Sequence, residues 1–130
     1  MSDTVVVRNL TAAIRDRGSA AYILTVSDRG TPHVVQGDVR GEGDQLVAQV
    51  GERTAQHARV RPEVSLLYPF RGAGDYSLIV DATATVTGEP GEHRLLLAPT
   101  RAVLHRPGPA PDPASQCGAD CVPLSLRPFP

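Results

Sequence analysis

The chain has 130 residues and a formal net charge of −1, and 41% of its residues are hydrophobic while 21% are charged. This composition is typical of a single globular domain, and it argues against a membrane span or a broad electrostatic surface for nucleic acid. Lys is absent because all 13 basic residues are Arg, which excludes Schiff-base chemistry through a Lys side chain.

The N-terminal half predicts a helix followed by three strands. The first four residues lack the basic stretch and apolar core of a secretion signal, so we expect a cytoplasmic protein. Residues 9–17 have helical spacing of apolar positions, with Asn9 as the N-cap. Gly-containing turns separate three β-rich runs, which indicates hairpins. These runs are residues 20–27, 33–40 and 45–50.

The second half predicts a short helix and three further strands. The helix, residues 54–61, ends before Pro62 because a residue that precedes Pro disfavours the helical conformation. The run 75–87 alternates apolar and polar residues, as expected for a strand with one buried face. In the last run, Pro99 suggests an edge, a bulge or a bend. The three strands are expected at residues 63–68, 75–87 and 93–104.

The C-terminal segment is rich in Pro. Seven of the 12 Pro residues fall at or after residue 107, a density that no helix or central strand tolerates. We therefore expect a folded domain over residues 1–106 and an extended tail over 107–130, either loosely ordered or draped on the domain. The predicted fold is mainly β (α+β), a six-stranded antiparallel β-barrel with short helices, since closure removes exposed sheet edges.

This order of elements and its local sequence resemble the flavin-binding split-barrel superfamily typified by pyridoxamine 5′-phosphate oxidase. The similarity lies in a strand, a Gly-x-Pro turn and a second strand, then a polar-basic helix start, then a Pro-x-Val-Ser-Leu strand. These pieces are residues 21–35, 51–58 and 61–67. The resemblance implies a homodimer with a cofactor at the subunit interface, usually FMN. Other branches use the deazaflavin coenzyme F-420 or bind haem.

The segment from Gly51 to His57 is the strongest candidate for a cofactor phosphate. It follows a strand and opens a helix, and the N–H groups at a helix start favour phosphate, which Arg53 and the hydroxyl of Thr54 would complete. The family often places a Lys here, which this chain lacks. The alternative is an ordinary helix start, with Thr54 as the N-cap and Arg53 solvated.

The isoalloxazine ring is expected against the second strand. The resemblance implies that Val35, Gln36 and Val50 face the ring, while Gly37 allows a close approach or marks a bulge. Basic residues typical of the family are not evident on this strand, where only Arg40 appears near the end. This departure leaves open a member that has changed or lost its cofactor.

Histidines and cysteines give weaker candidates. His57 ranks first among the four His residues because it lies on the candidate helix, and a haem-binding branch would use a His as axial ligand. Cys117 and Cys121 form a Cys-x3-Cys pair, and a zinc site would need further ligands such as His105 or Asp120. The alternatives are a redox role beside a flavin, or two reduced thiols in a tail.

Together these observations predict an FMN-binding oxidoreductase, in which a hydride passes between the flavin and a small organic substrate. The alternatives are a deazaflavin (coenzyme F-420)-dependent reductase, or a split barrel that binds haem or flavin without turnover or has no cofactor. The high content of Arg, Ala, Gly and Pro suits a high-GC bacterium. No catalytic residue is assigned from the sequence.

Overall fold

The computed structural model describes residues 9–72, 74–107 and 119–126. Apart from the start of the second helix and the last strand, which lies in the segment expected to be an extended tail, the elements agree closely with the predicted ranges. In chain order they are α1 (Leu10–Arg17), β1 (Ala20–Val26), β2 (Pro32–Glu42), β3 (Gln45–Gln49), α2 (Glu52–Val60), β4 (Glu63–Tyr68), β5 (Ser77–Thr87), β6 (Arg94–Pro107) and β7 (Ala119–Pro123).

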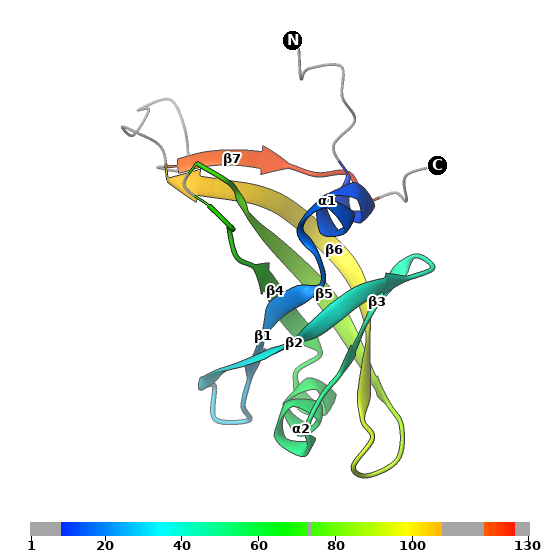
Figure 1. The fold of residues 1–130 in the computed structure, drawn as a ribbon. Coiled ribbons are helices and arrows are strands. Elements are labelled where there is room, and N and C mark those ends of the chain that lie inside the picture. The colour runs from blue at the N-terminus through cyan, green and yellow to red at the C-terminus, as the bar shows by residue number, and fades with distance from the viewer. Residues whose placement is uncertain (1–8, 73, 108–118, 127–130) are drawn as a thin grey trace.

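Six strands close into one antiparallel barrel (Figure 1). The order of neighbours is β3-β2-β1-β4-β5-β6, and the barrel closes because β3 also pairs with β6, with Leu46 opposite Leu97. Hairpins join β1 to β2, β2 to β3 and β5 to β6. The expected six-stranded antiparallel split barrel with short helices is confirmed.

Strand β6 pairs with two different neighbours along its length, in addition to β5. Its first half pairs with β3 and its second half pairs with β7, while β5 accompanies it throughout. The register slips by one residue between the halves, because Asp81 lies opposite Arg101 whereas Ala82 lies opposite Pro99. The hydroxyl of Thr100, the extra residue, donates a hydrogen bond of 3.1 Å to the carbonyl of Asp81. Of the edge, bulge or bend that Pro99 suggested, the structure shows a bulge.

The barrel interior holds the hydrophobic core. Alternate residues of every barrel strand point inward, so that Ile23, Leu66, Leu78 and Leu95 are almost fully buried. Tyr68 also lies inside, and its hydroxyl donates a hydrogen bond of 2.8 Å to the carbonyl of Val39 on another strand. The period-two pattern predicted for residues 75–87 is thus confirmed, because Leu78, Val80, Ala82 and Ala84 are all buried.

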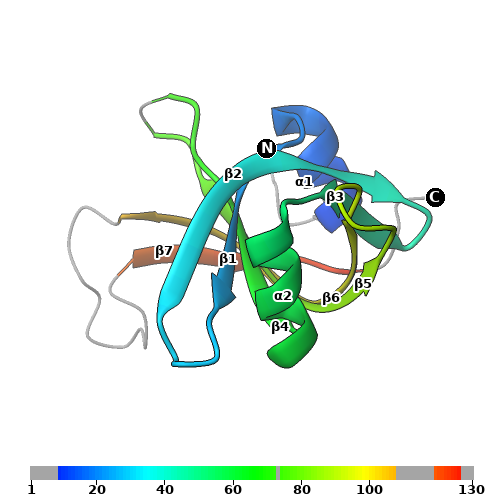
Figure 2. The same cartoon turned by 90° about the horizontal axis from the view of Figure 1, so that it is seen from below.

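The two helices lie at opposite ends of the barrel. Helix α1 packs Leu10 and Ile14 on the core, and the side-chain oxygen of Asn9 accepts a hydrogen bond from the Ala12 N–H, which confirms Asn9 as the N-cap. Helix α2 lies across the lower end, as Figure 2 shows from below, and buries Ala55 and Ala58 against the strands.

Residues 119–126 of the C-terminal segment lie on the domain. Strand β7 pairs with the second half of β6, Leu124 is buried, and the Leu10 N–H donates a hydrogen bond of 2.9 Å to the carbonyl of Ser125. Two Pro residues, Pro107 and Pro123, stand at strand ends, where a missing N–H costs little. This part of the predicted tail is therefore draped on the barrel.

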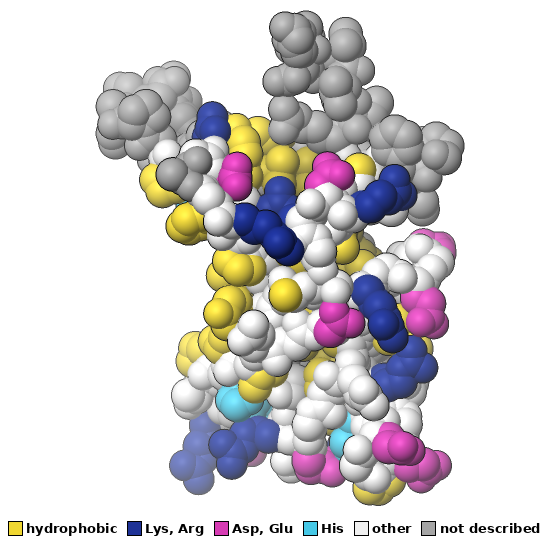
Figure 3. All heavy atoms as spheres, in the orientation of Figure 1, with side chains coloured by type: hydrophobic (Ala, Val, Ile, Leu, Met, Phe, Trp, Pro, Cys, Tyr) yellow, Lys and Arg dark blue, Asp and Glu magenta, His cyan; other side chains and the backbone are white. Residues whose placement is uncertain are grey.

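One outer surface of the sheet is apolar. Five side chains of neighbouring strands point outward together, and Tyr22 and Val34 are the most exposed, at 36% and 54%. In Figure 3, hydrophobic side chains gather along the left edge of the molecule, over β4 and β1. We name this surface the outer apolar face; it consists of Tyr22, Leu24, Val34, Leu67 and Ile79.

No helix among the described residues is long and apolar enough to cross a membrane.

Candidate functional site

Most of the residues predicted to hold a cofactor line one pocket at the N-terminus of α2. The pocket has a volume of about 380 Å³ and is built from β2, the end of β3 and the first turn of α2, together with Ile23 of β1. Six of the seven predicted residues line it: Val35, Gln36, Val50, Gly51, Arg53 and Thr54. His57 does not line it. The barrel thus brings together segments that are far apart in the chain.

Helix α2 starts at Glu52, earlier than the predicted residue 54. Gly51 is the N-cap, with φ −80° and ψ 176°, and no side chain caps the first turn. The alternative with Thr54 as the N-cap is therefore wrong. Thr54 lies within the helix and is buried, whereas Arg53 is exposed. Thr54 was an N-cap candidate in the alternative interpretation because hydroxyl residues usually cap helices. Without a side-chain cap, the first-turn N–H groups remain available to an acceptor in the pocket.

His93 holds both sides of Gly51 in place. Its backbone carbonyl accepts a hydrogen bond of 3.0 Å from the Val50 N–H, and its ring Nε2 lies 3.0 Å from Glu52 Oε1. The side chain is only 3% exposed. Sequence reasoning missed this residue because the contact spans 41 positions, and a single His before a strand carries no signal of its own.

The partners of His93 define its protonation pattern. Arg59 Nη2 lies 3.4 Å from His93 Nδ1, and a guanidinium can only donate, so Nδ1 accepts and Nε2 carries the proton that is donated to Glu52. This hydrogen bond from His93, aided by the charge of Arg59, lowers the pKa of Glu52. The carboxylate at the helix start, which also lines the pocket, is thereby engaged by two partners, His93 and Arg59.

The fold also brings His33 and His57 together, although the sequence separates them widely. Their rings meet edge to face with centroids 4.9 Å apart. His57 Nδ1 lies 3.2 Å from the hydroxyl of Thr25, which is buried, while His33 lines the pocket. His57 is thus connected to the pocket through its contact with His33, and no sequence pattern could have paired these two residues.

Basic residues of the barrel strands lie in a neighbouring pocket of about 450 Å³ that shares Gln49 with the first. Arg40 and Arg94 line it, and each is paired with a carboxylate: Arg40 with Asp38 at 3.8 Å and Arg94 with Glu42 at 3.5 Å. Arg53 is therefore the basic residue that lines the candidate pocket itself.

Gly37 keeps a regular register opposite Ala21, so it does not mark a bulge. A Cβ at this position would come within 3.3 Å of the Ile23 side chain, which lines the pocket. Gly37 thus leaves space behind the pocket wall, which a larger residue would reduce by pushing Ile23 forward.

The Cys-x3-Cys pair is only partly described. Cys117 lies outside the described residues, whereas Cys121 is exposed on β7 opposite His105 of β6. Within the part of the chain that the structure describes, no group of three or more His, Cys, Asp or Glu residues is placed to hold a metal ion.

Solved structures share this architecture. A putative pyridoxamine 5′-phosphate oxidase from Listeria innocua has a TM-score of 0.61 at 16% identity, covering 72% of this chain and 93% of its own. An F-420 reductase gives 0.59 at 15% identity over 74% and 98% of the two chains. HutZ, the haem storage protein of Vibrio cholerae, gives 0.57 at 15% identity over 68% and 87%. The chain therefore shares the split-barrel fold of these structures, and the fold that the resemblance implied is confirmed.

Sequence comparison places the chain more narrowly. It is 34% identical over 135 residues to uncharacterized proteins of Mycobacterium bovis and of Mycobacterium tuberculosis, covering 92% of this chain and 94% of each relative. The chain therefore belongs to one family with these two mycobacterial proteins. No protein-family model matches it.

Proposed function

We propose that this protein binds FMN in the pocket at the start of α2 and transfers a hydride between the flavin and a small organic substrate. The observation that carries the proposal is the uncapped first turn of α2, which opens beside Arg53 into a pocket whose apolar contacts come from Ile23, Val35 and Val50. The fold shared with a putative pyridoxamine 5′-phosphate oxidase supports the same choice.

The first turn fits the phosphate end of the cofactor. Its N–H groups and the positive end of the helix dipole favour an anion, and Arg53 adds up to five donors in a planar fork. Glu52 would oppose an anion at this place. Its carboxylate, however, accepts a hydrogen bond from His93 and lies 3.7 Å from the Arg59 guanidinium, so its charge is largely balanced.

The remaining lining fits the ring. Val35 and Val50 are half-buried and supply apolar contact, while the amides of Gln36 and Gln49 offer donors and acceptors to its polar edge. When bound, a flavin supplies the hydride-transfer chemistry itself. In this proposal Arg53 and the helix N–H groups bind the phosphate, His93 holds Val50 and Glu52 in position, and the apolar walls exclude water.

We further propose that two copies of the chain pair through the outer apolar face. Two exposed apolar side chains on adjacent strands are costly in water, and a second copy would cover them symmetrically. Gln36 points outward on β2 next to Val34 and also lines the pocket, so the pocket reaches the edge of this face. A partner seated there would cover the cofactor.

Titration of the full chain with FMN, the deazaflavin coenzyme F-420 and haem, followed by absorbance and calorimetry, tests the choice of cofactor. FMN should bind near one per chain. Arg53→Ala should weaken it by about 1.5–3 kcal/mol, the scale of a charge-assisted hydrogen bond. The charge-matched control Arg101→Ala, on β6, should leave affinity unchanged. Tighter binding of either other cofactor would overturn FMN as the ligand, and unaltered affinity of the Arg53 variant would place the phosphate elsewhere.

Oligomeric state is tested separately by analytical ultracentrifugation. The native chain should sediment as a dimer. Val34→Asp, which places a charge on the most exposed residue of the outer apolar face, should sediment as a monomer with unchanged circular dichroism. Thr83→Asp, at an exposed position of β5, is the control. A monomeric native chain would refute the pairing.

A further inference from the structure

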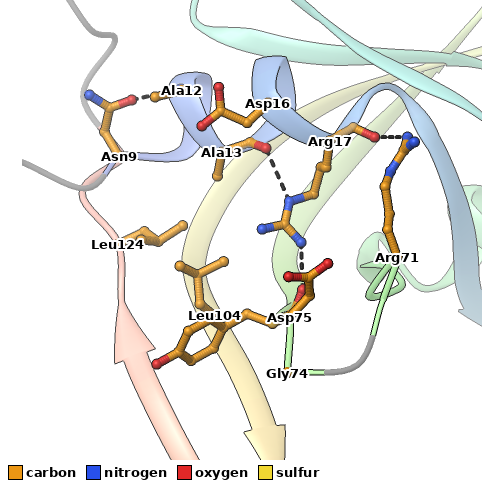
Figure 4. Close-up of a pocket in the computed structure, with 11 residues that line it drawn as sticks. Asn9, Ala12, Ala13, Asp16, Arg17, Arg71, Gly74, Asp75, Leu104 and Leu124 are labelled. Carbon is orange, nitrogen blue, oxygen red and sulfur yellow. Dashed lines mark hydrogen bonds between the residues drawn. The ribbon is translucent and has the colours of Figure 1, made fainter.

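A second, larger pocket lies at the other end of the barrel, where α1, the β4–β5 connection and β6 meet (Figure 4). Its volume is about 520 Å³, within the range of small-molecule sites. It shares no lining residue with the pocket at α2. Whatever binds here therefore binds independently of the proposed flavin contacts.

The inner wall of this pocket is apolar. Leu104 of β6 and Leu124, which follows β7, are both buried and border the pocket from below α1 in Figure 4. Ala12 and Ala13 add small apolar groups from α1, and Tyr76 adds an aromatic ring. The guanidinium of Arg106 stacks on this ring, with its central carbon 4.4 Å from the ring centroid. A ligand of this pocket needs an apolar portion.

Arg17 places a fixed cation at the pocket. Its Nε donates to the Ala13 carbonyl at 3.1 Å and its Nη1 donates to the Tyr76 carbonyl at 2.7 Å, which hold the half-buried guanidinium between α1 and the β4–β5 connection. Two of its five N–H donors are used in this way, so three remain. Because the side chain is already immobilised, an acceptor would bind it at little cost in conformational entropy.

Arg71 adds a second cation, since it donates a hydrogen bond to the backbone carbonyl of Arg17. Burial lowers the pKa of Arg17 and the neighbouring charge of Arg71 lowers it further, whereas Asp75 and Asp16 oppose the change. The guanidinium of Arg17 can bind a carboxylate, and the charge of Arg71, whose own guanidinium is bonded to the backbone carbonyl of Arg17, adds to the attraction. The two aspartates on the same rim favour an ammonium group.

We propose that this pocket binds a free α-amino acid with an apolar side chain. The carboxylate of the ligand would lie on the guanidinium of Arg17, its ammonium group would face Asp75 and Asp16, and its side chain would pack on Leu104 and Leu124. A simple fatty acid would meet the repulsion of both aspartates, and an amine would meet that of both arginines, so only a zwitterion satisfies the whole rim.

Isothermal titration of the full chain with L-leucine tests the proposal. Three analogues separate its parts: 4-methylpentanoate lacks the ammonium group, 3-methylbutylamine lacks the carboxylate, and glycine lacks the side chain. L-leucine should bind saturably and at least about tenfold more tightly than each analogue. The first two analogues lose one charge-assisted contact, and glycine loses the burial of an apolar side chain. Equal binding of an analogue, or no saturable binding of L-leucine at millimolar concentrations, would overturn the proposal.

Two variants assign the binding to this pocket. Arg17→Gln should weaken L-leucine by about tenfold or more, and Arg15→Gln, which removes the same charge from the exposed side of the same helix, should not. Since Arg17 also holds α1 to the β4–β5 connection, Asp75→Asn serves as a second variant at an exposed side chain and should weaken L-leucine similarly. If the Arg17→Gln variant and the Asp75→Asn variant both bind L-leucine with the affinity of the native chain, the site is refuted.

Discussion

Tyr68 allows a prediction that links one buried hydroxyl to the stability of the whole barrel. Replacement by Phe keeps the ring but removes the hydrogen bond to the carbonyl of Val39. A net hydrogen bond contributes roughly 0.5–1.5 kcal/mol, and a buried acceptor left unpaired raises the cost, so Tyr68→Phe should lower the free energy of unfolding at neutral pH by about 1–2 kcal/mol. Urea unfolding followed by far-UV circular dichroism measures this.

The same residue predicts a loss of stability in alkali. Burial raises the pKa of Tyr68 above the value of about 10 that a Tyr has in the unfolded chain. Above that pH the unfolded state has released a proton that the folded state still holds, so the free energy of unfolding falls as pH rises. From linkage, the loss between pH 10 and 11 is roughly 1 kcal/mol for this one group.

The composition makes this titration unusually clean, because a chain without Lys has no side-chain amine that ionises in the same range. Tyr68→Phe should remove most of the alkaline loss, whereas Tyr22→Phe, at a partly exposed position, should retain it. If Tyr68→Phe loses stability between pH 10 and 11 as steeply as the native chain, the reasoning about this hydroxyl is refuted.

Two other variants test local geometry. Gly88, in the β5–β6 turn, has φ +95°, and a Cβ there would lie 2.2 Å from the Glu92 carbonyl oxygen. Gly88→Ala should therefore lower the free energy of unfolding in urea by about 1–3 kcal/mol or more. An unchanged free energy of unfolding would contradict this turn geometry. Asn9→Ala removes the side-chain cap of α1 and should cost about 1 kcal/mol, whereas Asn9→Asp, which keeps the acceptor, should cost much less; equal losses would show that the cap is not the cause.

Local sequence patterns predicted much of this fold because they are tied to local physics. The alternation over residues 75–87 requires one buried face, and Pro99 cannot donate to a ladder, which is why a strand and a bulge could both be expected. The start of α2 was placed too late because Gly51 caps it without any side chain. Strand β7 was not predicted as a strand because Pro dominates its surroundings, yet it pairs with β6.

The candidate site, like the fold, could be predicted from the sequence only in part. The lining of the pocket by Val50, Gly51 and Arg53 was predictable, since they are consecutive or nearly so at a strand-to-helix junction. The contacts of His93 with Glu52 and of His33 with His57 were not, because closure of the barrel alone brings these residues together. The apolar pocket beside Arg17 likewise depends on α1, β6 and the segment after β7, which share no sequence pattern.

Closure of the barrel through β3 and β6 also has a consequence for the rate of folding. Leu46 must find Leu97 across about two fifths of the chain, and such distant pairings form slowly because much chain entropy is lost before any contact repays it. Until they meet, both strands have unpaired edges that another molecule can occupy. Refolding should therefore compete with aggregation, and dilution should favour the native barrel.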